Sequence, residues 1–323
     1  MADINYDTLY NRILDISACI NIPLKSFAIY VVVRHTPQNL RHYSYFILNT
    51  MIWNFLANFV FAFMHLYPLF PAICFRVDGI SSNFIDNEVY GQFMFILMFF
   101  LISECAFAFL FAFPHRYIVF VHPNFAARIR PAWVFALCGA THVIFALFYF
   151  PLVNEWTVSY DDYPNKAELP ERPFVFCFYP NGIRKIAIVA AYWLVTTVGC
   201  IIFAACSFLF LRNVRKLKTS IIYDSTLALQ KRLFASLLML TVITLFFGGI
   251  PLVFSISLTM FPYTSHAREA TLVSNVFLAN YGSISAIAYL VSFKAYRDAV
   301  KQIFSSSIGR FTQTKVRTIS LNC

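Results

Sequence analysis

Long apolar segments constrain this chain more than any other feature of its sequence. A helix needs about 20 mostly apolar residues to cross the hydrocarbon core of a bilayer, and seven stretches meet this requirement. They cover residues 13–33, 43–66, 91–113, 132–152, 186–211, 233–258 and 270–292. Because lipid offers no partner to unpaired backbone groups, each stretch is expected to be a helix. The sequence therefore predicts an all-α integral membrane protein, a bundle of seven transmembrane helices.

The composition supports one membrane domain followed by a short tail. Only 12% of the residues are charged, whereas soluble domains carry about a quarter. We assign residues 1–293 to the seven-helix domain and residues 294–323 to a cytoplasmic tail. An apolar stripe in this tail recurs at helical spacing and predicts an amphipathic helix at the membrane surface; the alternative is a solvated basic tail. The stripe consists of Tyr296, Ala299, Val300, Ile303 and Phe304.

The basic residues of the connecting loops predict the orientation of the bundle. Cytoplasmic loops of membrane proteins carry an excess of Lys and Arg. The loops after the first, third and fifth spans, together with the tail, hold seventeen basic residues, and the opposite side holds seven. The N-terminus is therefore expected outside, in a multi-pass protein of the plasma membrane. The net charge of +10 then reflects topology and contact with anionic lipids, and no nucleic-acid partner is expected.

Two of the eight cysteines lie in segments predicted to face the oxidising outside. Cys74 follows the second span and Cys177 lies in the second external loop, so they are the single external pair available. A disulfide between them would tie the outer end of the second span to this loop. Two free thiols remain the alternative.

Glu104 is the main candidate for chemistry inside the membrane. An ionisable group within a bilayer is costly and points to a function by default. Glu104 is the only charge of the third span and is predicted to lie below the membrane midplane. It is interpreted either as an intramembrane polar switch or as a static hydrogen-bonding group. Asp15, Pro23 and Lys25 make the first span the weakest of the seven.

The sequence gives little support to an enzyme. It contains no metal-binding cluster of His and Cys, no nucleophile elbow and no phosphate-binding loop. The intramembrane carboxylates do not occur as a pair. We therefore predict neither catalysis nor a metal or cofactor.

Several motifs, in order along nearly the whole chain, resemble those of nematode serpentine chemoreceptors, class H especially. They are Ile22-Pro23-Leu24 with Tyr30 and Thr36-Pro37; Leu48-Asn49 with Trp53 and Leu56; Pro68-Leu69-Phe70-Pro71-Ala72 with Gly79; Ser225-Thr226 with Leu229-Gln230-Lys231; Tyr281-Gly282-Ser283; and Tyr296-Arg297. Residue 295 is Ala where the family usually has Pro. Pro114 and His115 precede Arg116, where many receptors place an acidic residue beside the Arg.

The resemblance implies a chemosensory G-protein-coupled receptor. It also implies that the protein lies in the sensory cilium of chemosensory neurons. Its partners would be a small-molecule ligand in the outer half of the bundle and a heterotrimeric G protein inside. Counting along the helices places the candidate ligand-binding residues His65, Tyr90, Phe95, Asn275 and Phe277 in the outer halves, with core packing as the alternative for each. The candidate coupling residues are Arg116, Arg212, Arg215, Lys216 and Lys218.

Two other classes of protein stay open. A seven-helix ligand-gated cation channel of the insect odorant-receptor kind would have its N-terminus inside, which the distribution of basic residues opposes. A small-molecule transporter usually shows inverted repeats and several buried charges. Gly248-Gly249-Ile250-Pro251 interrupts the sixth span but has no counterpart elsewhere in the chain.

Overall fold

A computed structural model gives the arrangement of the chain. It describes residues 6–38, 41–84, 87–121, 125, 128–169, 175–217, 235–236 and 238–305. Lys218 and the end of the tail lie outside these residues.

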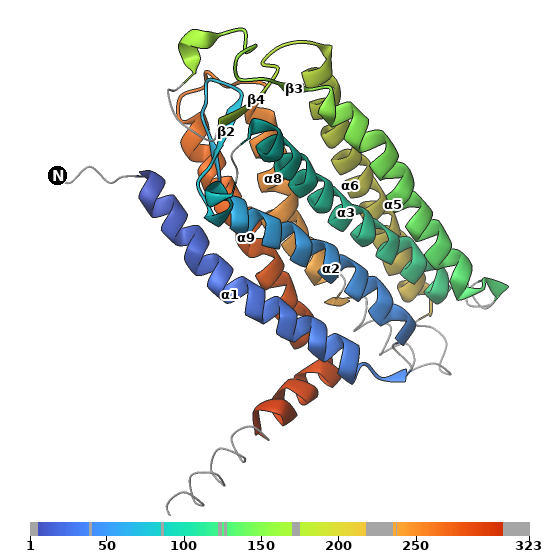
Figure 1. Ribbon diagram of the computed structural model, residues 1–323. Coiled ribbons are helices and arrows are strands. Elements are labelled where there is room, and N and C mark those ends of the chain that lie inside the picture. The colour runs from blue at the N-terminus through green and yellow to red at the C-terminus, as the bar shows by residue number, and fades with distance from the viewer. Residues whose placement is uncertain are drawn as a thin grey trace, which may run out of the picture.

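Long helices form most of the described structure (Figure 1). They are α1 (Tyr6–His35), α2 (Arg41–Met64), α3 (Glu88–Val121), α5 (Pro131–Asn154), α6 (Ile183–Leu217), α8 (Ile250–Leu258) and α9 (Ala267–Ser292). Six described helices, the last of them Leu238–Leu258, are each long and apolar enough to cross a membrane. The seventh, α9, passes that test together with the helix Lys294–Ser305. The predicted seven-helix membrane bundle is confirmed.

The first helix, which has the weakest sequence signal, is continuous. Pro23 lies inside α1 without ending it, and the helix stops before Thr36-Pro37, where the residue preceding a proline disfavours helical backbone. Polar contacts hold α1 against α9. Asn21 donates to the carbonyl of Ala279 at 2.8 Å, and Asn280 donates to Ser17 at 3.1 Å. These contacts explain the polarity of the seventh span, because its polar face is turned toward α1 and away from lipid.

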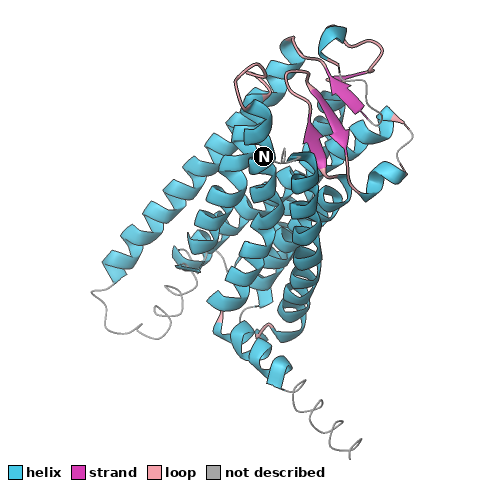
Figure 2. Ribbon diagram, turned by 90° about the vertical axis from the view of Figure 1, so that its left-hand side faces the viewer, coloured by secondary structure: helices cyan, strands magenta, loops and turns pink. Residues whose placement is uncertain are grey.

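A small antiparallel sheet covers one end of the bundle, which the all-α prediction did not include (Figure 2). Its strands are β1 (Leu66–Pro68), β2 (Cys74–Val77), β3 (Thr157–Val158) and β4 (Val175–Phe178), in the order β1-β2-β4-β3. The strands are too short to show a periodic pattern, and the β2–β4 pairing joins segments about a hundred residues apart. Such a long-range pairing cannot be predicted from local sequence.

The sixth span changes its winding in the middle. Residues Leu245–Gly249 form a π-helical turn, η5, directly before α8. Pro251 at the start of α8 has no N–H to donate to the preceding turn. The sequence predicted an interruption at Gly248-Gly249-Ile250-Pro251, and the structure gives it the form of a π-bulge, a feature frequent at functional sites.

The helix Lys294–Ser305 bends by 97° from α9 after Phe293. Tyr296 is buried, and its hydroxyl lies 3.0 Å from Oγ1 of Thr36 at the end of α1. The predicted apolar stripe is turned toward the bundle at Tyr296 and Ala299, whereas Phe304 is exposed. The basic side chains Lys294, Arg297 and Lys301 are exposed, in agreement with an amphipathic helix.

Candidate ligand-binding site

The disulfide and the sheet close the end of the bundle that the sequence predicts to face outside. Cys74 of β2 and Cys177 of β4 are opposite each other in the sheet and form a disulfide bond. Gln92 of α3 donates to the carbonyl of Val158 at 3.0 Å and so holds the sheet on the bundle. Gly91 allows this close packing, because a side chain there would meet the ring of Phe176 at 2.6 Å.

An ion-pair cluster attaches the start of α1 to the same sheet. Arg76 of β2 pairs with Asp78 and, at 3.0 Å, with Asp7. Burial lowers the pKa of Arg76, but the two carboxylates outweigh it and raise that pKa above its usual value. The Arg76 guanidinium also lies 4.7 Å from the centre of the Tyr67 ring, in the range of a cation–π interaction. The N-terminal end of α1 is therefore part of the wall of the outer end.

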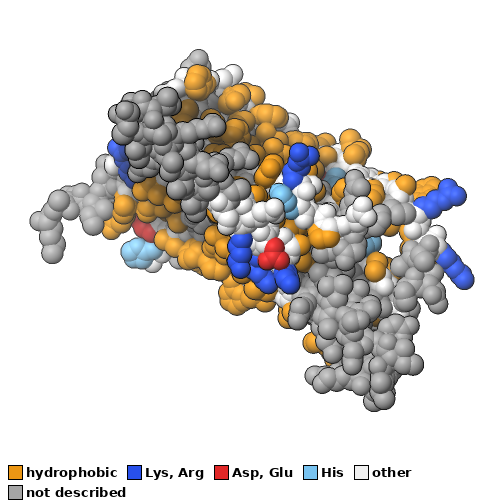
Figure 3. All heavy atoms as spheres, turned by 90° about the horizontal axis from the view of Figure 1, so that it is seen from below, with side chains coloured by type: hydrophobic (Ala, Val, Ile, Leu, Met, Phe, Trp, Pro, Cys, Tyr) orange, Lys and Arg blue, Asp and Glu red, His pale blue; other side chains and the backbone are white. Residues whose placement is uncertain are grey.

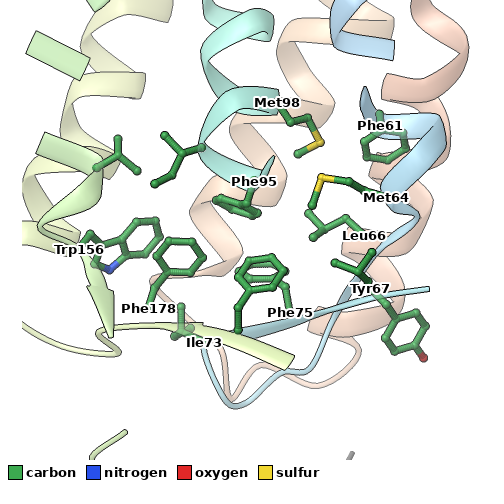
Figure 4. Close-up of a cluster of buried hydrophobic side chains, with 14 of the residues drawn as sticks. Phe61, Met64, Leu66, Tyr67, Ile73, Phe75, Phe95, Met98, Trp156 and Phe178 are labelled. Atoms are coloured by element: carbon green, nitrogen blue, oxygen red, sulfur yellow. The ribbon is translucent and has the colours of Figure 1, made fainter. Parts of the chain in front are cut away.

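Beneath the sheet lies a cavity surrounded by α3, α5, α6, α8, α9 and the sheet itself. Seven of the sixteen residues in its wall are aromatic, and Figure 4 shows Phe95, Phe75 and Trp156 among them within the buried hydrophobic cluster. The empty space between the lining atoms is about 590 Å³, of which about 50 Å³ accepts the centre of a water-sized particle. The aromatic lining consists of Phe70, Phe75, Phe95, Phe99, Tyr149, Trp156 and Tyr192.

A few polar groups interrupt this apolar wall. Tyr149 donates to the carbonyl of Ile96 at 3.1 Å, and Tyr192 lies 3.5 Å from the Tyr149 hydroxyl. Asn275 lies 3.3 Å from the Tyr10 hydroxyl. Ser255 differs from them: its hydroxyl is buried and has no hydrogen-bond partner among the described residues. An apolar cavity with a few polar groups is the usual form of a small-molecule site.

The structure separates the five predicted ligand-binding residues into two groups. Phe95 and Asn275 line the cavity. His65 is buried next to it, with its Nε2 3.7 Å from Asp15, and is not part of the wall. Tyr90 and Phe277 are 45% and 44% exposed, on the outer surface of their helices. Counting along a helix gives the depth of a residue but not the direction of its side chain, and the structure turns these two side chains away from the cavity wall.

Several residues of the cavity had no signal in the sequence. Ser255 is one of many serines in apolar segments, and Trp156 lies in a loop beyond the predicted end of its span. Trp156 enters the cavity because its ring packs on Phe178 of β4 at 4.6 Å and its Nε1 donates to the carbonyl of Tyr179 at 2.9 Å. Strand pairing therefore brings Trp156 to the cavity, whereas the packing of α8 brings Ser255 there.

Glu104 pairs with His142, and so connects α3 with α5 inside the membrane. The Glu104 side chain is fully buried, and its Oε1 atom has no partner among the described residues. His142 lies within 3.5 Å of Cys138 and 3.4 Å of Asn49 on α2. The group therefore joins three helices below the cavity. Among the described residues, no set of His, Cys, Asp and Glu has the arrangement of a metal site.

Four of the five predicted coupling residues lie near helix ends opposite the sheet. Arg212 is exposed near the end of α6. Arg215 and Lys216 lie farther along the same helix, and Arg116 lies in the last turns of α3. The side chains of Arg116, Arg215 and Lys216 are not described, and Lys218 lies outside the described residues. Figure 3 views the molecule from this end, where Lys and Arg outnumber acidic side chains among the residues drawn in colour.

Seven spans, a disulfide-tied sheet and a cavity beneath it define the chain as a multi-pass membrane protein with a seven-helix bundle. The comparison with family models identifies the particular family. The model of the serpentine type 7TM GPCR chemoreceptor Srh matches residues 5–306. The chain belongs to this family, as the motif resemblance predicted, and thus to a receptor class that is not enzymatic. No curated protein matches the chain significantly.

Proposed function

We propose that this chain is a chemosensory receptor that binds a small, largely apolar molecule in the outer cavity and activates a heterotrimeric G protein at the opposite end. The observation that carries the proposal is the unpartnered hydroxyl of Ser255 in an aromatic cavity. A buried hydroxyl without a partner is costly, and a ligand with one polar atom would remove that cost while its apolar part fills the rest of the space.

The size of the cavity limits the ligand. About 50 Å³ of the cavity accepts the centre of a water-sized particle, so the ligand is expected to be small. Small ligands gain at most about 1.5 kcal/mol per non-hydrogen atom, so we expect weak binding. Compounds should therefore be tested up to millimolar concentrations.

The sixth span offers a route from ligand to G protein. Ser255 and Ile256 of the cavity lie on α8, which follows the π-helical turn Leu245–Gly249, and Thr259 comes directly after the last residue of α8. A ligand that binds one position of α8 more tightly than another shifts the population toward it. On the inner side of the turn, Thr244 lies 3.3 Å from the Tyr281 hydroxyl of α9. A movement hinged at the turn would change this contact and the spacing of the inner helix ends.

The G protein would meet the basic inner end of the bundle. Arg116, Arg212, Arg215, Lys216 and Lys218 are our candidates for the contact, and the sensory cilium is the expected compartment in chemosensory neurons. Both expectations rest on the family and on the distribution of basic residues, which also puts the N-terminus outside.

A screen of small chemicals, with a second-messenger readout in transfected cells, tests the proposal. Val189→Phe narrows the cavity from α6, and we expect it to abolish the response to an active compound. Val198→Phe makes the same change at a partly exposed position of the same helix and should leave the response intact. Surface expression of both variants is measured by an external tag. An unchanged response from Val189→Phe would move the ligand to another site.

Arg116→Ala tests the coupling end. We expect loss of the second-messenger response with retained ligand-dependent thermal stabilisation of the purified protein. Arg130→Ala in the same predicted inner loop serves as the control. A normal response from Arg116→Ala would remove this residue from the coupling surface.

The two alternative classes have separate readouts. Ligand uptake without signalling would favour a transporter, and a ligand-gated current without G protein would favour a channel. Epitope tags at the two termini, stained without permeabilisation, test the orientation. A C-terminal tag accessible from outside would contradict it.

A further inference from the structure

Lys25 is a buried lysine in the middle of α1, and neither the ligand cavity nor the coupling end gives it a role. Its side chain is 3% exposed and lies between α1, α2 and α9. Gly282 of α9 makes room for it, because a side chain at this position would overlap both Lys25 and Asn54. The glycine of the Tyr281-Gly282-Ser283 motif thus has a physical reason in this chain.

No described residue neutralises this cation. The Nζ atom of Lys25 has no hydrogen-bond partner, and no described carboxylate forms a salt bridge with it. Glu104 pairs with His142, and Asp15 lies near His65. The neighbours of Lys25 are the Asn54 amide, the Cys105 thiol and Tyr281. These groups are polar but do not supply a formal negative charge.

A second unpartnered group faces the same space. Ser285 of α9 is 7% exposed; its hydroxyl lies near Tyr281 but makes no hydrogen bond of normal geometry among the described residues. Ser285, Lys25 and Asn54 line one small cavity. The nearby Tyr281 hydroxyl is directed to Thr244 at 3.3 Å and to Cys105 at 3.9 Å.

The hydrogen-bonding chemistry of Lys25 and Ser285 limits what can occupy the cavity between them. An ammonium offers three donors and no acceptor, and a hydroxyl offers one donor, so the occupant has to accept hydrogen bonds. A water would accept them but leave the positive charge uncompensated in a medium where charge is costly. About 10 Å³ of this cavity accepts the centre of a water-sized particle, which is enough for a single small particle.

We propose that Lys25 and Ser285 hold a small inorganic anion of the size of chloride at the junction of α1, α2 and α9. The amide of Asn54 can turn its N–H donors toward the anion by rotation about its last side-chain bond. The anion would act as the missing counter-ion and would favour the packing seen here, in which α1 is held against α9. The site is separate from the ligand cavity, but it shares Tyr281 with the contact to Thr244 that we propose to change on activation.

Thermal unfolding of the purified full chain in detergent tests this site. Sodium chloride is titrated against sodium gluconate at constant ionic strength. We expect a saturable rise of Tm with chloride, and a similar rise with bromide. Lys25→Met keeps the length of the side chain without its charge and should abolish the chloride dependence. Ser285→Ala should shift the half-saturating chloride concentration upward severalfold.

Lys185→Met is the matched control for a buried lysine. Lys185 is 5% exposed, but its Nζ donates to the carbonyl of Pro180 at 2.7 Å, so this variant should keep the chloride dependence. Binding of radioactive chloride to wild type and Ser285→Ala gives a direct measurement if Lys25→Met does not fold. A wild-type Tm that is the same in chloride and gluconate, or a Lys25→Met protein with unchanged chloride dependence, would overturn the proposal.

Discussion

The substitution Ser255→Ala tests whether Ser255 contacts the ligand or stabilises the free receptor, because the two roles predict opposite effects on stability and on the ligand response. The Ser255 hydroxyl is buried, lines the cavity and has no described partner. Removing it breaks no hydrogen bond of the free receptor, and an unsatisfied buried hydroxyl costs about 1–3 kcal/mol. We therefore expect the free protein to be as stable as wild type or more stable.

The effect on an active ligand should have the opposite sign. If the ligand accepts a hydrogen bond from Ser255, its loss costs about 0.5–1.5 kcal/mol, which is about a 2- to 13-fold rise in the half-maximal concentration. The assay is a concentration–response curve of the second messenger, paired with Tm of the purified protein with and without ligand. The ligand-dependent rise of Tm should shrink in parallel.

Ser257→Ala is the control for this prediction. Ser257 lies on the same helix, donates to the carbonyl of Val253 at 2.6 Å and accepts from Trp193 Nε1 at 3.2 Å. Its loss should lower Tm, since hydrogen bonds in membrane bundles contribute about 0.6 kcal/mol on average, and should leave the half-maximal concentration unchanged. A Ser255→Ala receptor with a lower Tm and a wild-type response curve would refute the reasoning.

Three further predictions concern stability, each measured as Tm or free energy of unfolding. Gly79→Ala should destabilise by about 1–3 kcal/mol, because the new Cβ would overlap a backbone carbonyl at the end of α2; Gly139→Ala, which meets no atom within 4 Å, should be tolerated. His142→Ala should cost about 3–5 kcal/mol by leaving Glu104 buried without its partner, and adding Glu104→Ala should recover part of that loss; a purely additive double variant would argue against the pair. Replacing both cysteines of the disulfide by serine should cost about 2–4 kcal/mol, whereas an unchanged Tm under reducing conditions would contradict a structural role.

The sequence alone predicted the class of the protein and its bundle of membrane helices. Long apolar segments force helices in a bilayer for a reason that is local, since every backbone group must be satisfied within its own segment. Counting at 1.5 Å per residue put Phe95 and Asn275 in the outer halves of their spans, and the structure places both in the cavity wall. Cys74 and Cys177 stood out because they alone lie in segments predicted to face outside.

The tertiary structure decided which side chains meet. The direction of a side chain around its helix depends on the packing of the neighbouring helices, so Tyr90 and Phe277 are exposed while Ser255 faces the cavity. The residues that contact the intramembrane ionisable groups are also distant from them in the sequence. Glu104 pairs with His142 on α5, whereas Lys25 packs against Gly282 and has no carboxylate partner among the described residues. A one-dimensional pattern records that these charges are buried, but only the packed bundle shows whether each one has a partner.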